Sequence, residues 1–115
     1  MKDRIMLIAL GMAAMAVAGT VHAQDAKLVE KGEKLYVTNK CAICHSIAGK
    51  GNKKGPLDEA GSKLSAEEIR EWLINPIEIA AKAKSTRKPP MKSYAKLPKD
   101  DVEALVAYMQ SLKKK

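Results

Sequence analysis

The most specific chemical signal in the chain is the run Cys-Ala-Ile-Cys-His at residues 41–45. It reads C-x-x-C-H, the spacing at which two thiols attach covalently to one c-type haem. The adjacent histidine then lies over the iron and can serve as an axial ligand. The chain has two cysteines and two histidines, and the other histidine, His22, lies in a segment that we expect to be removed. We therefore predict one covalent haem c, attached through Cys41 and Cys44, with His45 bound to its iron.

Other sites also use a C-x-x-C pair, and the rest of the sequence argues against them. A structural zinc site needs four ligands, whereas the chain after residue 23 offers two cysteines and one histidine. A thioredoxin-like redox pair belongs in a βαβ setting, and no such pattern is present. A disulfide at this short spacing has poor geometry and leaves His45 without a role. The sequence therefore favours haem attachment.

Two methionines after residue 23 can compete for the second axial position of the iron, Met91 and Met109. Met109 lies on the apolar stripe of a predicted helix, where the ordinary role of methionine is to fill the core. Met91 follows Pro89 and Pro90, which fix φ, so less loop entropy is lost when its sulfur binds iron. We predict that Met91 is the ligand. The alternative is that Met91 packs against the porphyrin and the iron stays five-coordinate.

The first 23 residues have the organisation of a secretory signal. A positively charged start precedes an apolar run over residues 5–18, and Val-His-Ala at residues 21–23 offers small residues for cleavage. An uncleaved membrane anchor is the alternative, but the run is shorter than the roughly 20 residues that a spanning helix needs. We therefore predict that residues 24–115 form the mature domain, located in the periplasm and without stable membrane insertion.

The segments that must position the site are helical, because apolar residues recur at helical spacing and no window alternates as a strand does. Gly32 in the first helix is expected to permit a close crossing with another helix. Ser65 and Glu68 form a capping box, and Asn75 with Pro76 is expected to start a further short helix. We predict an all-α domain with helices at about residues 25–39, 65–75, 75–84 and 99–112, and irregular segments at 46–63 and 85–98.

A domain of this size has a small core, since the chain has no phenylalanine and its aromatic side chains after residue 23 are Tyr36, Trp72, Tyr94 and Tyr108. Small domains bury a low fraction of their surface and depend on additional stabilising features such as disulfides or metal sites. A buried haem would supply the missing apolar volume. We therefore expect the haem-free chain to be poorly folded.

Taken together, residues 24–115 resemble class I cytochromes c, small mono-haem electron carriers. Gly32 and Tyr36 match the glycine and the aromatic residue of that family's first helix. Leu105 and Tyr108 match the residues that they cross in its last helix. The resemblance implies the cytochrome c fold, in which about four helices wrap around one covalently bound haem.

The resemblance also implies roles for residues around the haem. Met91 matches the distal ligand of the family. Pro56 matches the residue whose carbonyl accepts the Nδ1–H of the proximal histidine, here His45, a bond that orients the ring. Trp72 resembles the aromatic residue that lines the haem pocket, and Tyr94 is a second candidate for that role.

Two axial ligands leave no open coordination position for a substrate, so we predict an electron-transfer protein rather than an enzyme. Histidine and methionine together raise the reduction potential relative to two histidines. The expected function is that of a periplasmic one-electron carrier. Two alternatives stay open: the haem-bearing subunit of a larger oxidoreductase, and a haem sensor or enzyme whose sixth ligand can be displaced.

The charge of the chain bears on its partners. Its net charge is +8, and removal of Lys2, Asp3 and Arg4 with the signal lowers this to +7. We expect a monomer that docks redox partner proteins through acidic surfaces on those partners, with plain solvation of the charges as the alternative. Nucleic-acid binding is not expected, because the aromatic stacking platform is missing. The cations that flank the two predicted haem-lining loops are Lys50, Lys53, Lys54, Arg87, Lys88, Lys92 and Lys96.

Overall fold

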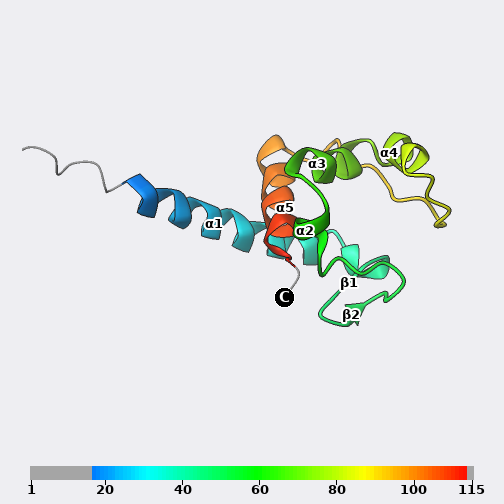
Figure 1. The fold of residues 1–115 in the computed structure, drawn as a ribbon, viewed down its shortest axis with the longest axis horizontal. Coiled ribbons are helices and arrows are strands. Elements are labelled where there is room, and N and C mark those ends of the chain that lie inside the picture. The colour runs from blue at the N-terminus through cyan, green and yellow to red at the C-terminus, as the bar shows by residue number, and fades with distance from the viewer. Residues whose placement is uncertain (1–16, 114–115) are drawn as a thin grey trace, which may run out of the picture.

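The computed structural model describes residues 17–113 of the chain, and these are mostly helical (Figure 1). The predicted all-α class is therefore confirmed. A hairpin with two residue pairs, Ser46 with Gly51 and Ile47 with Lys50, is the sheet structure in this part of the chain. The elements are α1 (Val17–Thr38), a 3₁₀ turn η1 (Cys41–Ile43), β1 (Ser46–Ile47), β2 (Lys50–Gly51), α2 (Ala60–Lys63), α3 (Ala66–Ile74), α4 (Pro76–Lys82) and α5 (Lys99–Ser111).

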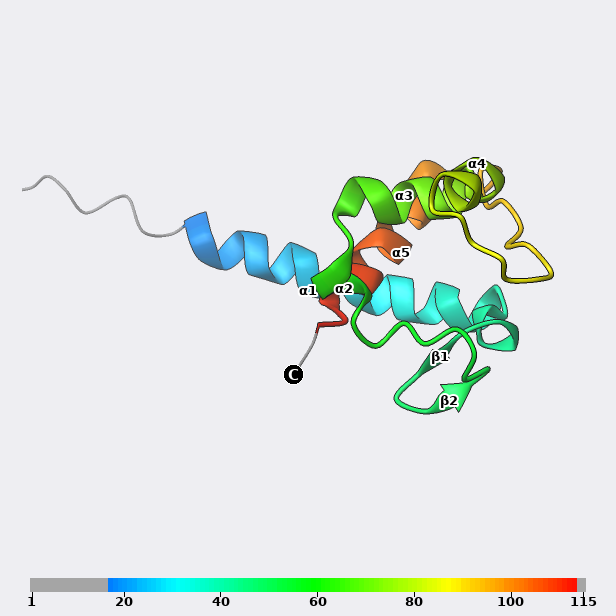
Figure 2. The same ribbon diagram turned by 45° about the vertical axis from the view of Figure 1, so that its right-hand side comes forward.

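The predicted signal, residues 1–23, lies mostly outside the described residues. Helix α1 begins at Val17 rather than near residue 25, so its backbone runs through the predicted cleavage position after Ala23. Its first turns extend away from the other elements (Figures 1 and 2). Within residues 17–113, no helix combines the length and the apolar character needed to cross a membrane. Cleavage of the signal stays a prediction.

Helices α1 and α5 cross (Figure 2), and Gly32 of α1 lies against α5. A Cβ atom added to Gly32 would overlap the carbonyl of Ala104 and would come within 2.6 Å of the Cβ of Tyr108. One turn further along α1, the ring of Tyr36 packs edge-on against Tyr108, with centroids 5.8 Å apart. The predicted close crossing is confirmed, and the atoms of α5 nearest to Gly32 belong to Ala104 and Tyr108. Leu105 is buried in the core, where it is 2% exposed.

The substitution Gly32→Ala is expected to lower the unfolding temperature of the holoprotein. Alanine is favoured over glycine in a helix by about 1 kcal/mol. That gain is outweighed because the new methyl group has to push α5 away, and overpacking costs about 1–3 kcal/mol. Thermal unfolding followed by circular dichroism measures the change, with Lys27→Ala on the exposed surface of the same helix as the control. An unfolding temperature equal to or above that of wild type would show that the crossing has room to spare.

The capping box predicted at the start of α3 is present. The N–H of Glu68 donates to the Ser65 Oγ at 3.1 Å, and the Ser65 N–H donates to the Glu68 carboxylate at 2.9 Å. Helix α4 follows directly, with Pro76 in its first turn as predicted. The Asn75 side chain makes no capping hydrogen bond to α4, however; its amide nitrogen donates to Glu71 in α3 at 3.3 Å.

Helix α2 lies in a stretch that was expected to be irregular. Gly61 allows it to approach the end of α5, since a Cβ at Gly61 would overlap the carbonyl of Gln110. The Gly61 N–H donates to the Leu112 carbonyl at 2.7 Å. This short helix is therefore held by a contact with a distant part of the chain, which local sequence does not reveal.

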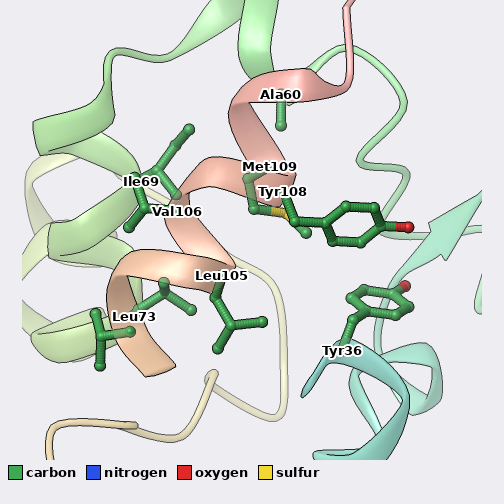
Figure 3. Close-up of a cluster of buried hydrophobic side chains, with 9 residues drawn as sticks. Tyr36, Ala60, Ile69, Leu73, Leu105, Val106, Tyr108 and Met109 are labelled. Carbon is green, nitrogen blue, oxygen red and sulfur yellow. The ribbon is translucent and has the colours of Figure 1, made fainter. Parts of the chain in front are cut away.

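The core gathers around α5 and joins α1, α2 and α3 to it (Figure 3). Arg70 of α3 and Glu103 of α5 add a two-point ion pair at the surface, with nitrogen–oxygen distances of 2.7 and 2.8 Å. Cys41, in the Cys-x-x-Cys-His turn, packs against this core. The buried apolar residues are Tyr36, Ala60, Ile69, Leu73, Val102, Ala104, Leu105, Val106, Tyr108 and Met109.

Candidate haem-binding site

The Cys-x-x-Cys-His segment forms a tight turn directly after α1. Lys40 adopts a left-handed conformation with φ of 56°, which ends the helical path and starts the 3₁₀ turn. The Cys41 carbonyl then accepts hydrogen bonds from the N–H groups of Cys44 at 3.1 Å and His45 at 2.9 Å. The turn brings both thiols and the imidazole to the wall of one cavity. Both cysteines are free thiols and partly buried.

Asn52 supports this turn, a role that the sequence did not reveal. Its N–H is shared between the carbonyls of Ala42 at 3.0 Å and His45 at 2.9 Å. Its side-chain amide donates to the Ile43 carbonyl at 3.1 Å. Gly51 before it has φ of 107°, a conformation open to glycine, and any side chain there would overlap the His45 carbonyl. The Gly-Asn pair indicates a turn. The pair alone does not show that Asn52 donates to three carbonyls of a different loop.

His45 is held in the tautomer that binds metal. Its Nδ1 lies 3.0 Å from the carbonyl of Gly55. Because a carbonyl only accepts, Nδ1 carries the proton and Nε2 keeps the lone pair that a metal needs. Burial lowers the pKa of His45; the bond to Gly55 opposes this shift and the charge of Arg87 adds to it. The ring is therefore neutral at neutral pH.

The prediction that Pro56 supplies this carbonyl is wrong by one residue. The acceptor is Gly55, which is buried and whose carbonyl also accepts the N–H of Ser46 at 3.1 Å. This second bond turns the Gly55 carbonyl toward the residue next to His45. Pro56 pairs with Ser46 through an isolated bridge and contributes to the cavity wall instead.

The predicted distal ligand, Met91, lines the same cavity from the segment between α4 and α5. That segment is anchored just after the methionine, because the Ser93 hydroxyl donates to the Ile74 carbonyl and the Tyr94 N–H donates to the Leu73 carbonyl, both at 2.7 Å. Met109 also borders the cavity, but it is only 7% exposed and belongs to the core face of α5. The geometry therefore brings Met91 and His45 to one site, as the sequence predicted.

The cavity has a volume of about 680 Å³, and its wall is largely apolar. Cofactor pockets span roughly 300–1,000 Å³ and combine apolar walls with a few polar groups. Trp72 lines it, as predicted. Tyr94 does not: it lies outside the cavity lining and near the Cys41 thiol. Burial raises the pKa of that thiol, and the nearby Tyr94 hydroxyl partly offsets the rise.

The described residues fit a metal that is bound in a macrocycle such as a porphyrin rather than a bare metal ion. Within residues 17–113, no cluster of three or more His, Cys, Asp or Glu side chains could hold a bare ion. The hydroxyl of Tyr36, a residue of the cavity wall, is buried and has no hydrogen-bond partner among the described residues. Burial raises its pKa to about 12. Leaving such a group unpaired costs about 1–3 kcal/mol, so a ligand with polar substituents on an apolar ring suits this wall.

Comparison with known proteins decides the family. Residues 29–113 match the cytochrome c family. The chain belongs to that family. The resemblance inferred from the sequence is thus confirmed, and with it haem-based electron transfer as the general function of this cytochrome c.

One curated relative is named cytochrome c oxidase subunit 2, from Alkalihalophilus pseudofirmus. It is 26% identical over 95 residues, which cover 75% of this cytochrome c and 26% of the relative. The chain therefore spans about a quarter of the length of that protein. No solved structure matches the chain significantly.

In this cytochrome c the roles of the protein groups follow from their chemistry. The thiols of Cys41 and Cys44 would form the two thioether bonds to a haem c, and the Nε2 atom of His45 would bind its iron. The Met91 thioether would offer a soft donor to the same iron.

Proposed function

We propose that this cytochrome c is a periplasmic one-electron carrier in which His45 and Met91 both bind the haem iron. When bound, haem c supplies one-electron exchange between ferric and ferrous iron. The observation that carries the proposal is the meeting of both cysteines, His45 and Met91 at one cavity, with the Nδ1 of His45 already engaged by a carbonyl. With both axial positions filled by protein, no position is left for a substrate.

The protein groups favour the reduced state. The methionine sulfur raises the reduction potential relative to a second histidine. The cavity wall is mostly apolar, and a low-dielectric surrounding disfavours the extra positive charge of the ferric state. We therefore expect a relatively high potential. A reversible one-electron wave in voltammetry of the holoprotein is the direct test, and a catalytic current with oxygen or peroxide would point to an enzyme instead.

We further propose that redox partners dock through acidic surfaces. Arg87 and Lys88 border the cavity from the methionine side and are exposed. Lys50, Lys53 and Lys54 are exposed on the loop that follows His45. Cations on these two segments would steer a negatively charged partner toward the haem edge.

The rate of reduction by an anionic reagent is expected to fall several-fold as salt rises. The Debye length shrinks from about 30 Å at 0.01 M to about 8 Å at 0.15 M ionic strength. Stopped-flow kinetics measure the reduction rate with an anionic and with a neutral reductant at each salt concentration. A dependence on salt that appears only with the anionic reductant is electrostatic. The pair Lys53→Gln and Lys54→Gln should flatten the salt dependence, and Lys27→Gln on α1 should not. Equal slopes for both reductants would leave plain solvation as the role of these charges.

A second candidate function is that of a haem-bearing subunit fixed within a larger oxidoreductase. It is favoured by the similarity to a protein named as a subunit of cytochrome c oxidase. Size-exclusion chromatography of a native extract, followed by haem staining, separates the two. A carrier elutes alone at about the mass of its own chain, whereas a subunit elutes with a larger assembly.

A further inference from the structure

Arg87 joins the two sides of the cavity. It belongs to the segment that carries Met91, and its Nη2 donates to the carbonyl of Cys44, the residue before His45. Its Nη1 lies against Gly55, so closely that a Cβ added to Gly55 would overlap it. The guanidinium therefore sits on the two loops that hold the proximal histidine. Its space exists because residue 55 has no side chain.

The rest of this segment has few ties of its own. Residues 81–90 are all exposed. Their other hydrogen bonds are local, such as the Ser85 N–H to the Ala80 carbonyl at 2.9 Å and the Arg87 N–H to the Ser85 Oγ at 3.4 Å. Among the described residues, the Arg87 side chain makes the one hydrogen bond from this segment to the Cys-x-x-Cys-His turn.

Met91 consequently lies between two anchors. After it, Ser93 and Tyr94 are bound to the end of α3. Before it, the anchor is Arg87, four residues earlier. Pro89 and Pro90 lie between Arg87 and Met91 and fix φ at their positions, so the link between anchor and methionine is stiff. A stiff link passes a displacement of the anchor on to the sulfur.

We propose that Arg87 is a positioning residue that holds the segment carrying Met91 against the Cys-x-x-Cys-His turn. It thereby keeps the methionine sulfur at the iron site. The inference rests on the proposed ligation by His45 and Met91. Arginine is needed because its planar fork reaches the Cys44 carbonyl and the surface of Gly55 together. Lysine offers a single donor group at its tip and cannot make both contacts.

The test is the competition between Met91 and added imidazole in the ferric holoprotein. Imidazole binds iron when the methionine segment opens, so its apparent affinity reports that opening. We expect Arg87→Gln and Arg87→Lys each to bind imidazole about tenfold more tightly than wild type, the factor for losing a hydrogen bond from a charged donor. Lys84→Gln is the control, since Lys84 is exposed on the same segment and does not line the cavity. Its affinity should equal that of wild type.

Far-UV circular dichroism at each imidazole concentration shows whether the helices stay folded while the methionine is displaced. Should Arg87→Gln fail to mature, Arg87→Lys carries the test alone. If Arg87→Lys bound imidazole with the wild-type affinity, the proposal would be overturned, because a positive charge without the guanidinium geometry would then be enough to hold the segment. Failure of the underlying ligation looks different: wild type itself would bind imidazole as readily as Met91→Ala.

Discussion

Replacing Cys41 and Cys44 together by alanine is expected to give a colourless chain that no longer unfolds cooperatively. Without thioether bonds the cofactor is not retained, and the core is left beside a cavity of about 680 Å³. A chain of this size without phenylalanine has little other apolar surface to bury. Absorbance in the visible range and thermal unfolding by circular dichroism measure the two effects.

The matched control is Ile43→Ala in the same turn. The Ile43 side chain is 67% exposed, so its loss should change neither colour nor unfolding. A cysteine-free chain that is colourless yet melts cooperatively near the wild-type temperature would contradict the role given to the haem in the core.

Replacing Met91 by alanine is expected to leave the haem attached but to change its iron. The reduction potential should fall by on the order of 0.2 V, part of the roughly 0.8 V range that axial ligands cover. The reduced protein should also bind carbon monoxide, which wild type should not, because the sixth position loses its protein ligand. Potentiometric titration and the absorbance change on adding carbon monoxide measure these effects.

Met109→Leu is the control for this experiment. Met109 is buried in α5, and an exchange of methionine for leucine in a core usually costs less than about 1.5 kcal/mol. Its potential should stay near that of wild type. If Met109→Leu lost the sixth ligand and Met91→Ala kept it, the ligand would have been assigned to the wrong methionine.

Features coded by a few neighbouring residues could be predicted from the sequence. The Cys-x-x-Cys-His turn, the box formed by Ser65 and Glu68 and the first turn of α4 at Pro76 each depend on contacts within a few positions. Gly32 was also interpreted correctly, because a glycine inside an otherwise regular helix has few uses other than close packing. Met91 reaches the cavity as expected, since two prolines limit where its segment can go.

Features set by distant contacts could not be predicted. Helix α2 depends on the approach of Gly61 to the end of α5, and the Asn52 bonds reach into another loop. The family resemblance predicted Pro56 as the acceptor for His45, and the sequence does not give the direction in which either carbonyl of the Gly-Pro pair points. Ser46 turns the Gly55 carbonyl, and that is visible only in the fold.

The most direct test of the central claim is the visible and near-infrared absorption spectrum of the ferric holoprotein, purified after export with the haem-attachment machinery. Ligation by His45 and Met91 predicts one haem per chain and the weak near-infrared charge-transfer band of methionine-bound ferric haem. A colourless protein, or a haem protein that lacks this band, would contradict the account.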